Sequence, residues 1–328
     1  MTEGGPPRVA VLILNWNDKC STLETLESVR GLAYPNIEVF LVDNGSTDMS
    51  REAVAAQFPE VHVISSPKNL GVARGRNLGL THVLQQSDIE YVLFLDNDVT
   101  VEPRLVDKLV ATAESQADCG IIGPTIYYSS DPRRIWSAGV SIVFRDVTAK
   151  KVARRPLGWE RRGTVIERVE SITGCCMLVK RQVFTSVGSF NPKYFMVGDE
   201  TDFCYRAARQ GIASAVVPGA KVWHKISSST GGGYAPPRAY FTGRSTILFL
   251  KEHGRPWHWM TTLPLAAVSL LLAYPRERWK GNQRAVAFKL RGYLDGLLGR
   301  PVHPEVREFF QRKDLLPFRG KHVQEDPT

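Results

Sequence analysis

Two carboxylates separated by one residue form a candidate metal site. Asp96 and Asp98 flank Asn97 and follow the apolar run 91–95, which has the composition of a buried strand. Side chains at positions i and i+2 of an extended segment point to the same side. Such a pair can hold a hard divalent cation, Mg²⁺ or Mn²⁺, together with a sugar hydroxyl. The alternative is a polar turn that ends the strand. Neutral His224 could complete the metal shell, although a lone histidine is more often a surface or core residue.

A second acidic group lies about 100 residues further along the chain. Asp199, Glu200 and Asp202 open a segment with the pattern of a helix, which Gly211 ends. Carboxylates stabilise the first turn of a helix, but that explains one acid better than it explains three. The functional interpretation is a general base that removes a proton from an attacking hydroxyl.

Residues that follow two earlier strands are suited to binding a base. Asp43 comes after the apolar run 37–42 and can accept a hydrogen bond from an imide N–H. Uracil, thymine and guanine carry that group and adenine lacks it. An Asx turn with Gly45 is the structural alternative. Trp16, after the run 9–14, could pack on a base or fill the core.

The start of one predicted helix has the composition of an anion site. Asn69 and Gly71 lie at its beginning, and Arg76 and Asn77 lie within it. Backbone N–H groups at a helix N-terminus bind anions, and an arginine strengthens such a site. Glycines that let a helix pack closely are the alternative interpretation.

Alternating strands and helices must position these residues. Apolar runs at 9–14, 37–42, 61–64 and 91–95 predict strands, and helical periodicity is present near 23–29, 48–57, 71–86 and 102–115. This order favours right-handed βαβ units, a mostly parallel sheet and an α/β fold. Ligands of such sheets bind beyond the carboxyl ends of the strands, where Asp43 and Asp96 are expected to lie.

The rest of the chain is less regular. Short strands are expected near 121–127, 140–144 and 171–179, around a basic loop at 145–168 that is expected to move. The Ser-, Gly- and Pro-rich stretch 227–237 predicts a flexible domain boundary. We therefore expect a catalytic domain at 1–235 and a basic helical region at 236–328.

Composition excludes several classes of protein. Of the 328 residues, 43% are hydrophobic and 23% are charged, which excludes wholesale disorder and fibrous structure. Five scattered cysteines without a C-x-x-C motif argue against a disulfide scaffold and a cysteine zinc site, and fit a reducing cytosol. No signal peptide is expected, because residues 1–8 are polar and the next apolar run is short.

The net charge of +9 is concentrated in the last third of the chain. Residues 236–328 hold 16 Lys and Arg against 8 Asp and Glu, whereas the remainder holds 26 against 25. Within this part the run 256–275 has no Asp, Glu, Lys or Arg and, as a helix, would be about 30 Å long. Because Pro264 interrupts the run and basic residues flank both ends, a helix lying on an anionic membrane is favoured over a span or a buried bundle helix. No nucleic-acid-binding module accompanies the basic residues.

Together these motifs resemble glycosyltransferase family 2, over roughly residues 8–250. The segments 15–17, 42–48 and 69–79 resemble its nucleotide-binding half, and 96–98 resembles its D-x-D motif. The segment 174–178 resembles the acceptor-side strand, 195–211 the E-D-x-D-x-x-x-R helix and 240–244 the Y-x-x-R segment. The resemblance implies a GT-A fold, with a Rossmann-like, mostly parallel central sheet flanked by helices and a C-terminal helical extension.

The resemblance also implies roles for particular residues. A nucleoside-diphosphate sugar would be bound by Asn15, Trp16, Asn17, Asp43, Asn69, Gly71, Arg76, Asn77, Asp96 and Asn97. Asp98 and His224 would hold Mg²⁺ or Mn²⁺, one of Glu200, Asp199 and Asp202 would be the catalytic base, and Gly174, Cys175 and Arg244 would lie toward the acceptor. The implied activity is that of an inverting, rhamnosyltransferase-like enzyme that acts on a glycan or a lipid-linked acceptor.

The chain departs from the family pattern in two places. The Glu-Asp pair appears as Asp199-Glu200, which leaves the base open, and Ser245 replaces the asparagine after the arginine. The Q-x-x-R-W motif of processive synthases is absent from the sequence, which favours the addition of one or a few sugars. UDP-hexose, dTDP-rhamnose and GDP-mannose all remain compatible with Asp43. The expected location is cytoplasmic, on the inner face of the membrane.

Two other classes of protein compete with this interpretation. A sugar-nucleotide pyrophosphorylase needs a Gly-rich basic loop after the first strand, where this chain has the segment 15–18, Asn-Trp-Asn-Asp. A non-catalytic scaffold that binds sugar nucleotides or lipids would have no reason to retain both Asp98 and the three acids.

Overall fold

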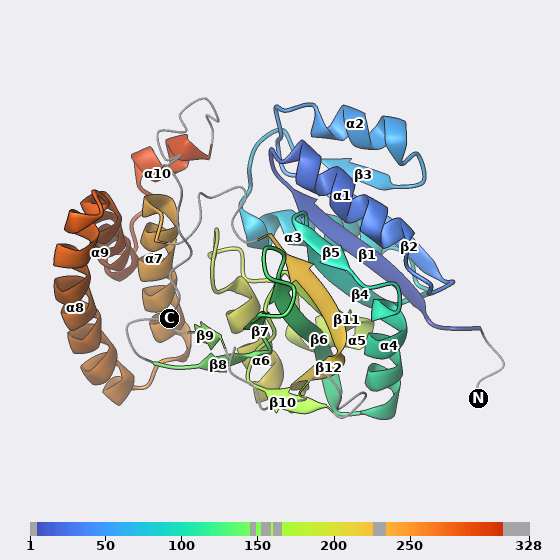
Figure 1. Cartoon of the computed structure of the whole chain (residues 1–328). Coiled ribbons are helices and arrows are strands. Elements are labelled where there is room, and N and C mark those ends of the chain that lie inside the picture. The colour runs from blue at the N-terminus through green and yellow to red at the C-terminus, as the bar shows by residue number, and fades with distance from the viewer. Residues whose placement is uncertain (1–4, 145–148, 152–158, 160–165, 226–233, 311–328) are drawn as a thin grey trace. The chain divides into compact units, whose positions relative to one another are not determined.

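The computed structural model describes residues 5–144, 149–151, 159, 166–225 and 234–310 (Figure 1). These residues form two units, which are described separately. The first comprises Met1–Ile142, Ala149–Pro192 and Asp199–Ile226, and the second comprises Val143–Thr148, Lys193–Gly198 and Ser227–Thr328. Most of the predicted basic loop 145–168 and of the predicted boundary 227–237 lies outside the described residues.

The first unit is built on a mixed sheet of ten strands. These are β1 (Arg8–Asn15), β2 (Ile37–Asp43), β3 (His62–Ser65), β4 (Ile89–Asp96), β5 (Val99–Val101), β6 (Cys119–Tyr128), β7 (Ile135–Ser137), β10 (Glu167–Val169), β11 (Cys176–Lys180) and β12 (Ala213–His224). The order is β10-β12-β6-β11-β4-β1-β2-β3, with β5 paired to β12 and β7 to β6. Strands β8 (Val140–Ile142) and β9 (Ala149–Lys151) form a separate pair.

Four neighbouring strands form the parallel half of this sheet. Strands β3, β2, β1 and β4 all run in one direction, so their carboxyl ends meet at one edge. Alternate side chains of each strand enter opposite faces, as Val11 and Leu12 do on β1. This half has the predicted mostly parallel, Rossmann-like arrangement, and β11 joins it to β6 by antiparallel pairing.

Helices cover both faces of the sheet (Figure 1). Helices α1 (Lys19–Arg30), α2 (Ser50–Gln57) and α4 (Leu105–Ser115) contribute Leu26, Val54 and Leu109 to the apolar cluster on one face. Helices α3 (Val72–Val83), α5 (Arg181–Val187) and α6 (Asp199–Arg209) contribute Leu80, Phe184 and Phe203 to the cluster on the other. The result is an α/β fold of three layers, in which most of the apolar surface of the sheet is removed from water.

The longest strand of the sheet is one that the sequence pattern does not reveal. Strand β12 contains Pro218 and Gly219, residues that are depleted in strand interiors. Its pairing with β6 shifts register between Val217 and Lys221, so the two residues sit in an irregularity rather than in the regular ladder. This strand carries His224 at its end.

The second unit consists of helices. They are α7 (Pro236–His253), α8 (Pro256–Trp279), α9 (Gln283–Leu297) and the short α10 (Pro304–Phe309). Helices α7 and α9 approach so closely that a Cβ added to Gly292 would lie 2.0 Å from the carbonyl oxygen of Tyr240. Only glycine fits at that position, which fixes the spacing of the two helices.

Helix α8 exposes most of its apolar side chains. Nine large ones are exposed: Trp257, Met260, Leu263, Leu265, Val268, Leu271, Leu272, Tyr274 and Trp279. Its buried residues are Thr262, Ala266 and Glu277. The expectation that Pro264 interrupts this segment is wrong, because the helix continues through Pro264 and Pro275. A proline removes a single backbone hydrogen bond, and the bonds on either side can hold the helix together.

Among the described residues, no helix combines the length and the apolar character that a membrane span requires.

Candidate active site

The carboxyl ends of the parallel strands bring several predicted donor-binding residues together. Asn15, at the end of β1, is in register with Asp43 at the end of β2, and its neighbour Leu14 is in register with Asp96 of β4. The Asn97 amide donates to Asn15 Oδ1 at 3.0 Å, which ties the turn after β4 to β1. The edge predicted to hold the ligand therefore carries a cluster of polar side chains, most of them buried.

Two carboxylates and an imidazole meet beside this edge. Ligand atoms of Asp96, Asp98 and His224 all lie within 4.8 Å of one another. His224 Nε2 is 3.0 Å from Asp98 Oδ1, because β12 and β5 pair in a register that sets His224 opposite Val99. His224 Nδ1 is buried without a hydrogen-bond partner among the described residues. Two oxygen donors and one nitrogen donor, all held within reach of one point, fit a divalent cation.

The charge balance of this group also fits a cation. Burial raises the pKa of Asp96 above its usual value, although the guanidinium of Arg76 opposes the effect. The neighbouring charge of Asp98 raises that pKa further. A cation bound between the two carboxylates would replace the proton that burial favours.

Arg76 lies at the centre of the polar cluster and is almost completely buried, with 4% of its surface exposed. Its Nη1 donates to Asp199 Oδ2 at 2.9 Å. Its Nη2 donates to Asp96 Oδ1 at 3.0 Å and to the carbonyl oxygen of Gly174 at 2.7 Å. The sequence predicts Arg76 as part of an anion site, and the structure directs its guanidinium to two carboxylates of the protein.

The three acids of α6 have different surroundings. Asp199 is buried against Arg76, and Asp202 is fully buried and accepts a hydrogen bond from Arg206 Nε at 2.8 Å. Glu200 is partly exposed. Burial raises the pKa of Glu200 to about 7, and the charge of Asp199 and a hydrogen bond with it act in the same direction. A carboxyl group that titrates near neutral pH is suited to accept a proton in catalysis.

The backbone that enters α6 is unusual and was not signalled by the sequence. Val197 has a φ of 65° and Gly198 a φ of 93°. Positive φ is rare for a β-branched residue, and such strained positions cluster at functional sites. The acids of α6 thus follow directly on a conformation that a simple helix start would not require.

Two loops that carry predicted donor-binding residues are held together by asparagines. Asn69 Oδ1 accepts hydrogen bonds from the amide of Asn44 at 3.1 Å and from the backbone N–H of Gly71 at 2.8 Å. Asn44 Oδ1 in turn accepts from the N–H of Leu70 at 2.9 Å. Asn44 was not among the predicted site residues, and its place in the turn at 43–48 is the signal that could have found it.

Two further asparagines also fix loops. The Asn77 amide donates to the carbonyl oxygen of Phe190 at 2.8 Å and accepts from its N–H at 3.0 Å. Asn17, with a φ of 54°, accepts from the N–H of Thr47 at 2.6 Å. Both predicted donor-binding residues therefore use their side chains to hold backbone.

Three further predicted residues, Asp43, Trp16 and Cys175, differ in burial and in their contacts. Asp43 Oδ1 accepts from the N–H of Ser46 at 3.2 Å, so the turn that was the structural alternative is made with Ser46 rather than Gly45. Trp16 is half-buried. Cys175 is buried, and its carbonyl oxygen accepts from the N–H of Asp96 at 3.0 Å.

Comparison with known families decides the class of the protein. A model of the family described as glycosyl transferase family 2 matches residues 10–188, which are more than half of the chain. The chain belongs to glycosyl transferase family 2. It is therefore a glycosyltransferase enzyme that uses nucleoside-diphosphate sugars in glycan biosynthesis.

Two curated relatives of this family 2 enzyme are named as rhamnosyltransferases. The N-acetylglucosaminyl-diphospho-decaprenol L-rhamnosyltransferase of Mycobacterium tuberculosis is 26% identical over 253 residues, which cover 67% of this chain and 76% of that protein. The dTDP-rhamnosyl transferase RfbF of Shigella flexneri is 23% identical over 255 residues, which cover 76% of this chain and 81% of that protein.

A solved structure has the same fold. The mannosyltransferase PcManGT from Pyrobaculum calidifontis, in complex with GDP-Man and Mn²⁺, superposes with a TM-score of 0.56 at 18% identity. The alignment covers 90% of this chain and 89% of that one. The fold of this glycosyltransferase is accordingly GT-A, as the sequence motifs implied.

One predicted acceptor-side residue belongs to the second unit of the glycosyltransferase. Arg244 lies on α7, where its Nη1 donates to the carbonyl oxygen of Arg300 at 2.7 Å. Gly174 belongs to the first unit and provides a carbonyl oxygen to Arg76, as described above.

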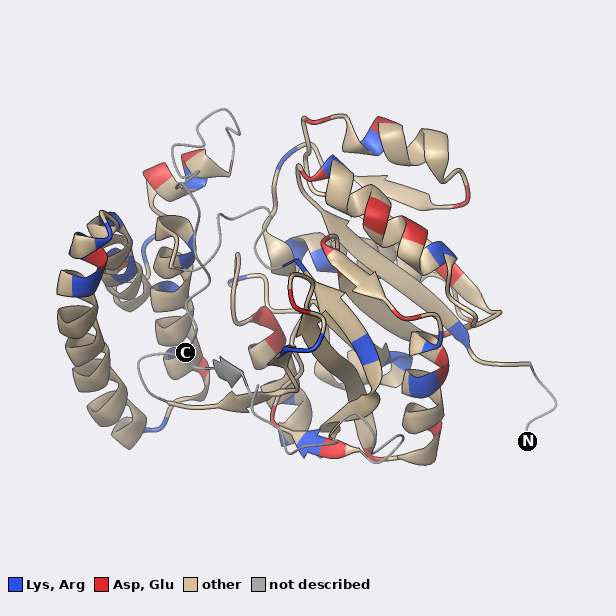
Figure 2. Ribbon diagram, in the orientation of Figure 1, with Lys and Arg blue, Asp and Glu red and all other residues tan. Residues whose placement is uncertain are grey.

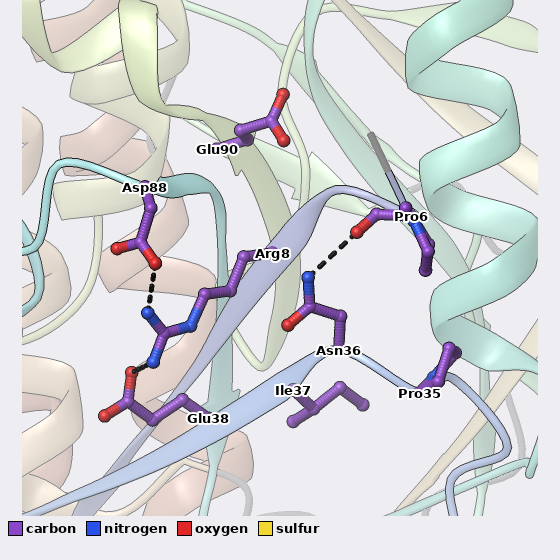
Figure 3. Close-up of a pocket in the computed structure, with 9 residues that line it drawn as sticks. Pro6, Arg8, Pro35, Asn36, Ile37, Glu38, Asp88 and Glu90 are labelled. Atoms are coloured by element: carbon purple, nitrogen blue, oxygen red, sulfur yellow. Dashed lines mark hydrogen bonds and ion pairs between the residues drawn. The ribbon is translucent and has the colours of Figure 1, made fainter. Parts of the chain in front are cut away.

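An open pocket lies at the opposite end of the strands of the enzyme and is not part of this site. Its lining includes Pro6, Arg8, Asn36, Glu38 and Asp88, at the amino ends of β1, β2 and β4 (Figure 3). Arg8 forms ion pairs with both Glu38 and Asp88, and Glu90 adds a further acidic group to the lining. Ligands of open α/β sheets bind at the carboxyl ends instead.

Proposed function

We propose that this enzyme transfers L-rhamnose from dTDP-rhamnose to a hydroxyl of a sugar carried on a polyprenyl diphosphate. The transfer inverts the anomeric carbon, depends on a divalent cation and adds one or a few sugars. The observation that carries the chemistry is the convergence of the Asp96, Asp98 and His224 group with the acids of α6, through the single residue Arg76. The names of the two relatives support the choice of donor and acceptor.

The base of the donor is recognised at the ends of β1 and β2. Asp43 is buried and uses one carboxylate oxygen in its turn, so the other is assigned to the imide N–H of thymine. The half-buried ring of Trp16 packs against the base, and Asp96 accepts from a hydroxyl of the ribose or the sugar. The loops that Asn15, Asn17, Asn69 and Asn77 hold in place give this surface its shape.

Asp98 and His224 would hold the divalent cation, with Mg²⁺ and Mn²⁺ both compatible with the donor atoms. A bound cation offsets the negative charge that develops on the leaving diphosphate.

Glu200 is assigned as the catalytic base. Asp199 and Asp202 are buried and each is held by an arginine, whereas Glu200 is partly exposed. The acceptor oxygen attacks the anomeric carbon from the face opposite the diphosphate, and the bond from that carbon to the phosphate oxygen breaks. The hydroxyl proton passes to Glu200, and the nucleoside diphosphate leaves. A positioned base of this kind typically contributes about 10²–10⁴ in rate.

The helices of the second unit support attachment to a membrane on its cytoplasmic face. The middle of α8 has no charged residue, as Figure 2 shows, and Met260 and Leu271 are 76% and 74% exposed. Helix α9 also exposes apolar side chains, those of Leu290 and Leu294, while it buries the charged residues Lys289 and Asp295. Apolar side chains that point outward suit an apolar environment.

The basic residues around α8 favour a membrane surface with anionic headgroups. Several basic residues border the apolar run of α8, namely Arg255, Arg276, Arg278, Lys280 and Arg284. Basic residues at this boundary favour anionic headgroups, by about 1 kcal/mol for each residue near the surface. A polyprenyl-linked acceptor is confined to the same bilayer, which agrees with the proposed substrate.

A donor panel tests the proposal. We would incubate the enzyme with Mn²⁺ and dTDP-rhamnose, UDP-glucose, GDP-mannose or ADP-glucose, and measure both thermal unfolding and transfer to N-acetylglucosaminyl-diphospho-polyprenol in micelles. A donor at about 100 times its dissociation constant should stabilise the fold by about 2.7 kcal/mol. dTDP-rhamnose should stabilise most and ADP-glucose least, because adenine lacks the imide that Asp43 is assigned to bind. Equal stabilisation by ADP-glucose would overturn the role assigned to Asp43. Transfer from another donor alone would mean that the transferred sugar is not rhamnose.

A further inference from the structure

Arg76 is buried in a site that is built for its guanidinium. Arginine is almost never fully buried without partners. Here its acceptors come from three separate segments: Asp96 at the end of β4, Gly174 before β11 and Asp199 at the start of α6. The ring of Phe190 lies 5.6 Å from the guanidinium carbon and covers it from another side.

The glycine at position 174 is part of this construction. A Cβ added there would lie 2.8 Å from Arg76 Nη1 and 3.0 Å from Nη2. Any larger residue would therefore displace the guanidinium. The position that the sequence predicts on the acceptor side has a local role, which is to leave room for Arg76.

The three contacts link the two halves of the proposed reaction. Asp96 belongs to the group assigned to the donor and the cation, and Asp199 precedes Glu200, the assigned base. One rigid, planar fork holds both carboxylates, so a change in the distance between Asp96 and Asp199 would break one of these hydrogen bonds or move Arg76. A misplacement of about 1 Å between reacting groups can cost about 10² in rate.

We propose that Arg76 is a positioning residue, which aligns Glu200 with the donor by holding Asp96 and Asp199 on one guanidinium. This inference rests on the proposed function and deepens it. It differs from the interpretation of Arg76 as an anion-binding residue, because the three contacts that occupy its guanidinium are made to the protein.

The electrostatics give a second consequence of the same geometry. The titratable groups that act on or through Glu200 are Asp199 and Cys204 of α6, Arg76 of α3 and Asp96 of β4. Among them, only Arg76 supplies a positive charge, and it lowers the pKa of Glu200 against the effects of burial and of Asp199. Removal of that charge should raise the pKa of Glu200 and move the acid limb of the rate profile to higher pH.

The test compares variants of Arg76 with a matched control. Arg76→Lys keeps the charge and loses the fork, and Arg76→Gln loses both. Arg206→Lys is the control, because Arg206 also binds a buried carboxylate, Asp202, and two backbone carbonyls, those of Val187 and Ser189. For each protein we would measure kcat, KM and the dissociation constant of dTDP-rhamnose, the pH profile of transfer and thermal unfolding.

We expect Arg76→Lys to lower kcat by about 10²-fold while the dissociation constant of the donor changes by no more than about threefold. Arg76→Gln should in addition move the acid limb upward, and Arg206→Lys should keep the wild-type kcat and profile. If Arg76→Gln does not fold, Gly174→Ala tests the same fork with Arg76 in place, and it should lower kcat in the same way. A normal kcat in Arg76→Lys would overturn the inference. A loss confined to donor affinity would also overturn it and would indicate that Arg76 binds the diphosphate.

A measurement without substrate separates this inference from the proposed function. The pKa of Glu200 can be followed by NMR in protein with ¹³C-labelled glutamate, with Glu200→Gln used to assign the resonance. A higher pKa in Arg76→Gln and an unchanged one in Arg206→Lys would support the coupling even if no donor were turned over. An unchanged pKa in both variants would overturn the coupling even if the wild-type enzyme transferred rhamnose.

Discussion

Helices α8 and α9 of the second unit place their side chains differently from the sheet of the first unit. In the first, apolar residues such as Val11 and Leu93 are completely buried in the faces of the sheet, and the charged groups gather at its carboxyl edge. In the second, α8 and α9 bury Glu277, Lys289 and Asp295 and expose leucines. Burial of apolar surface is the main driving force of folding in water, and the exposed leucines are therefore the observation behind the proposed attachment to a membrane.

Both units nevertheless obey the same rule for buried charge. Asp295 accepts a hydrogen bond from the Tyr240 hydroxyl at 3.0 Å and forms an ion pair with Arg291. Asp199 is held by Arg76 at 2.9 Å. A buried charge is tolerated only when it is paired and hydrogen-bonded. The difference is that the first unit sets a partly exposed carboxyl, Glu200, beside its buried pair, and Glu200 is the residue proposed as the catalytic base.

The largest effect should come from the cation site at the edge of the first unit. Asp98→Ala removes one of the assigned ligands and should abolish metal-dependent donor binding and transfer, while the fold survives because the residue lies beyond the end of β4. Calorimetry of dTDP-rhamnose with and without Mn²⁺ measures this. Asp88→Ala is the control, since Asp88 precedes the same strand at its amino end. Normal metal-dependent turnover in Asp98→Ala would show that the D-x-D interpretation is wrong.

The second largest effect should come from the proposed catalytic base, Glu200. Glu200→Gln keeps the shape of the side chain and removes the proton acceptor, so transfer should fall by about 10²–10⁴ with donor affinity near wild type. Because burial raises the pKa of Glu200 to about 7, the wild-type rate should rise with pH through about 7 and then level off. The variant should lose that dependence. Glu60→Gln, on the surface, is the control. A variant that transfers normally would move the role to another acid of α6.

The sequence predicts the first unit better than the second. Apolar runs locate β1 to β4 closely, and Asp43 and Asp96 lie at the carboxyl ends of β2 and β4, as predicted. It does not predict the contacts of Arg76, because its partners lie 20, 98 and 123 residues away and only the tertiary fold brings them together. Strand β12 is missed because of Pro218 and Gly219, and a positive φ at Val197 has no sequence signal.

In the second unit, the sequence predicts the helix α8 but not the orientation of its side chains. The uncharged run at 256–275 predicts a helix, but the run itself does not reveal which side chains face outward. A helix that is apolar on all sides is usually buried, so the pattern alone fits a bundle as well as a membrane. The exposure of Leu271 and the burial of Glu277 are not predicted by the run, because both depend on how α8 packs against its neighbours.

Binding to vesicles tests whether the exposed apolar side chains of α8 contact a membrane. Leu271→Glu with Leu272→Glu places two charges on the exposed face of α8 and should weaken binding to anionic vesicles by at least about tenfold, because burial of a leucine contributes about 1.5–3 kcal/mol. Met49→Glu is the matched control, since Met49 of the first unit is 66% exposed. Sedimentation with vesicles of phosphatidylglycerol and phosphatidylcholine measures the difference.

High salt separates the electrostatic contribution to vesicle binding from the apolar contribution. At about 1 M salt the screening length falls to about 3 Å, so the attraction between basic residues and headgroups should vanish while the apolar part remains. Partial release is therefore expected. Complete release would mean that the leucines of α8 do not enter the bilayer, and no binding to anionic vesicles at low salt would remove the membrane from the proposed function.

The smallest effect should be on stability in buffer, and it contrasts the two units directly. Leu271→Gln replaces a side chain that is 74% exposed, so the free energy of unfolding should change by less than about 0.5 kcal/mol. Leu93→Ala, in the fully buried centre of β4, should cost about 2–5 kcal/mol, because it removes apolar contacts and leaves a cavity. Thermal unfolding without lipid measures both. A large loss in Leu271→Gln would mean that this face of α8 is covered in solution, as it would be by a second copy of the chain. The stability of that variant would then depend on protein concentration, whereas a face reserved for lipid gives the same small change at every concentration.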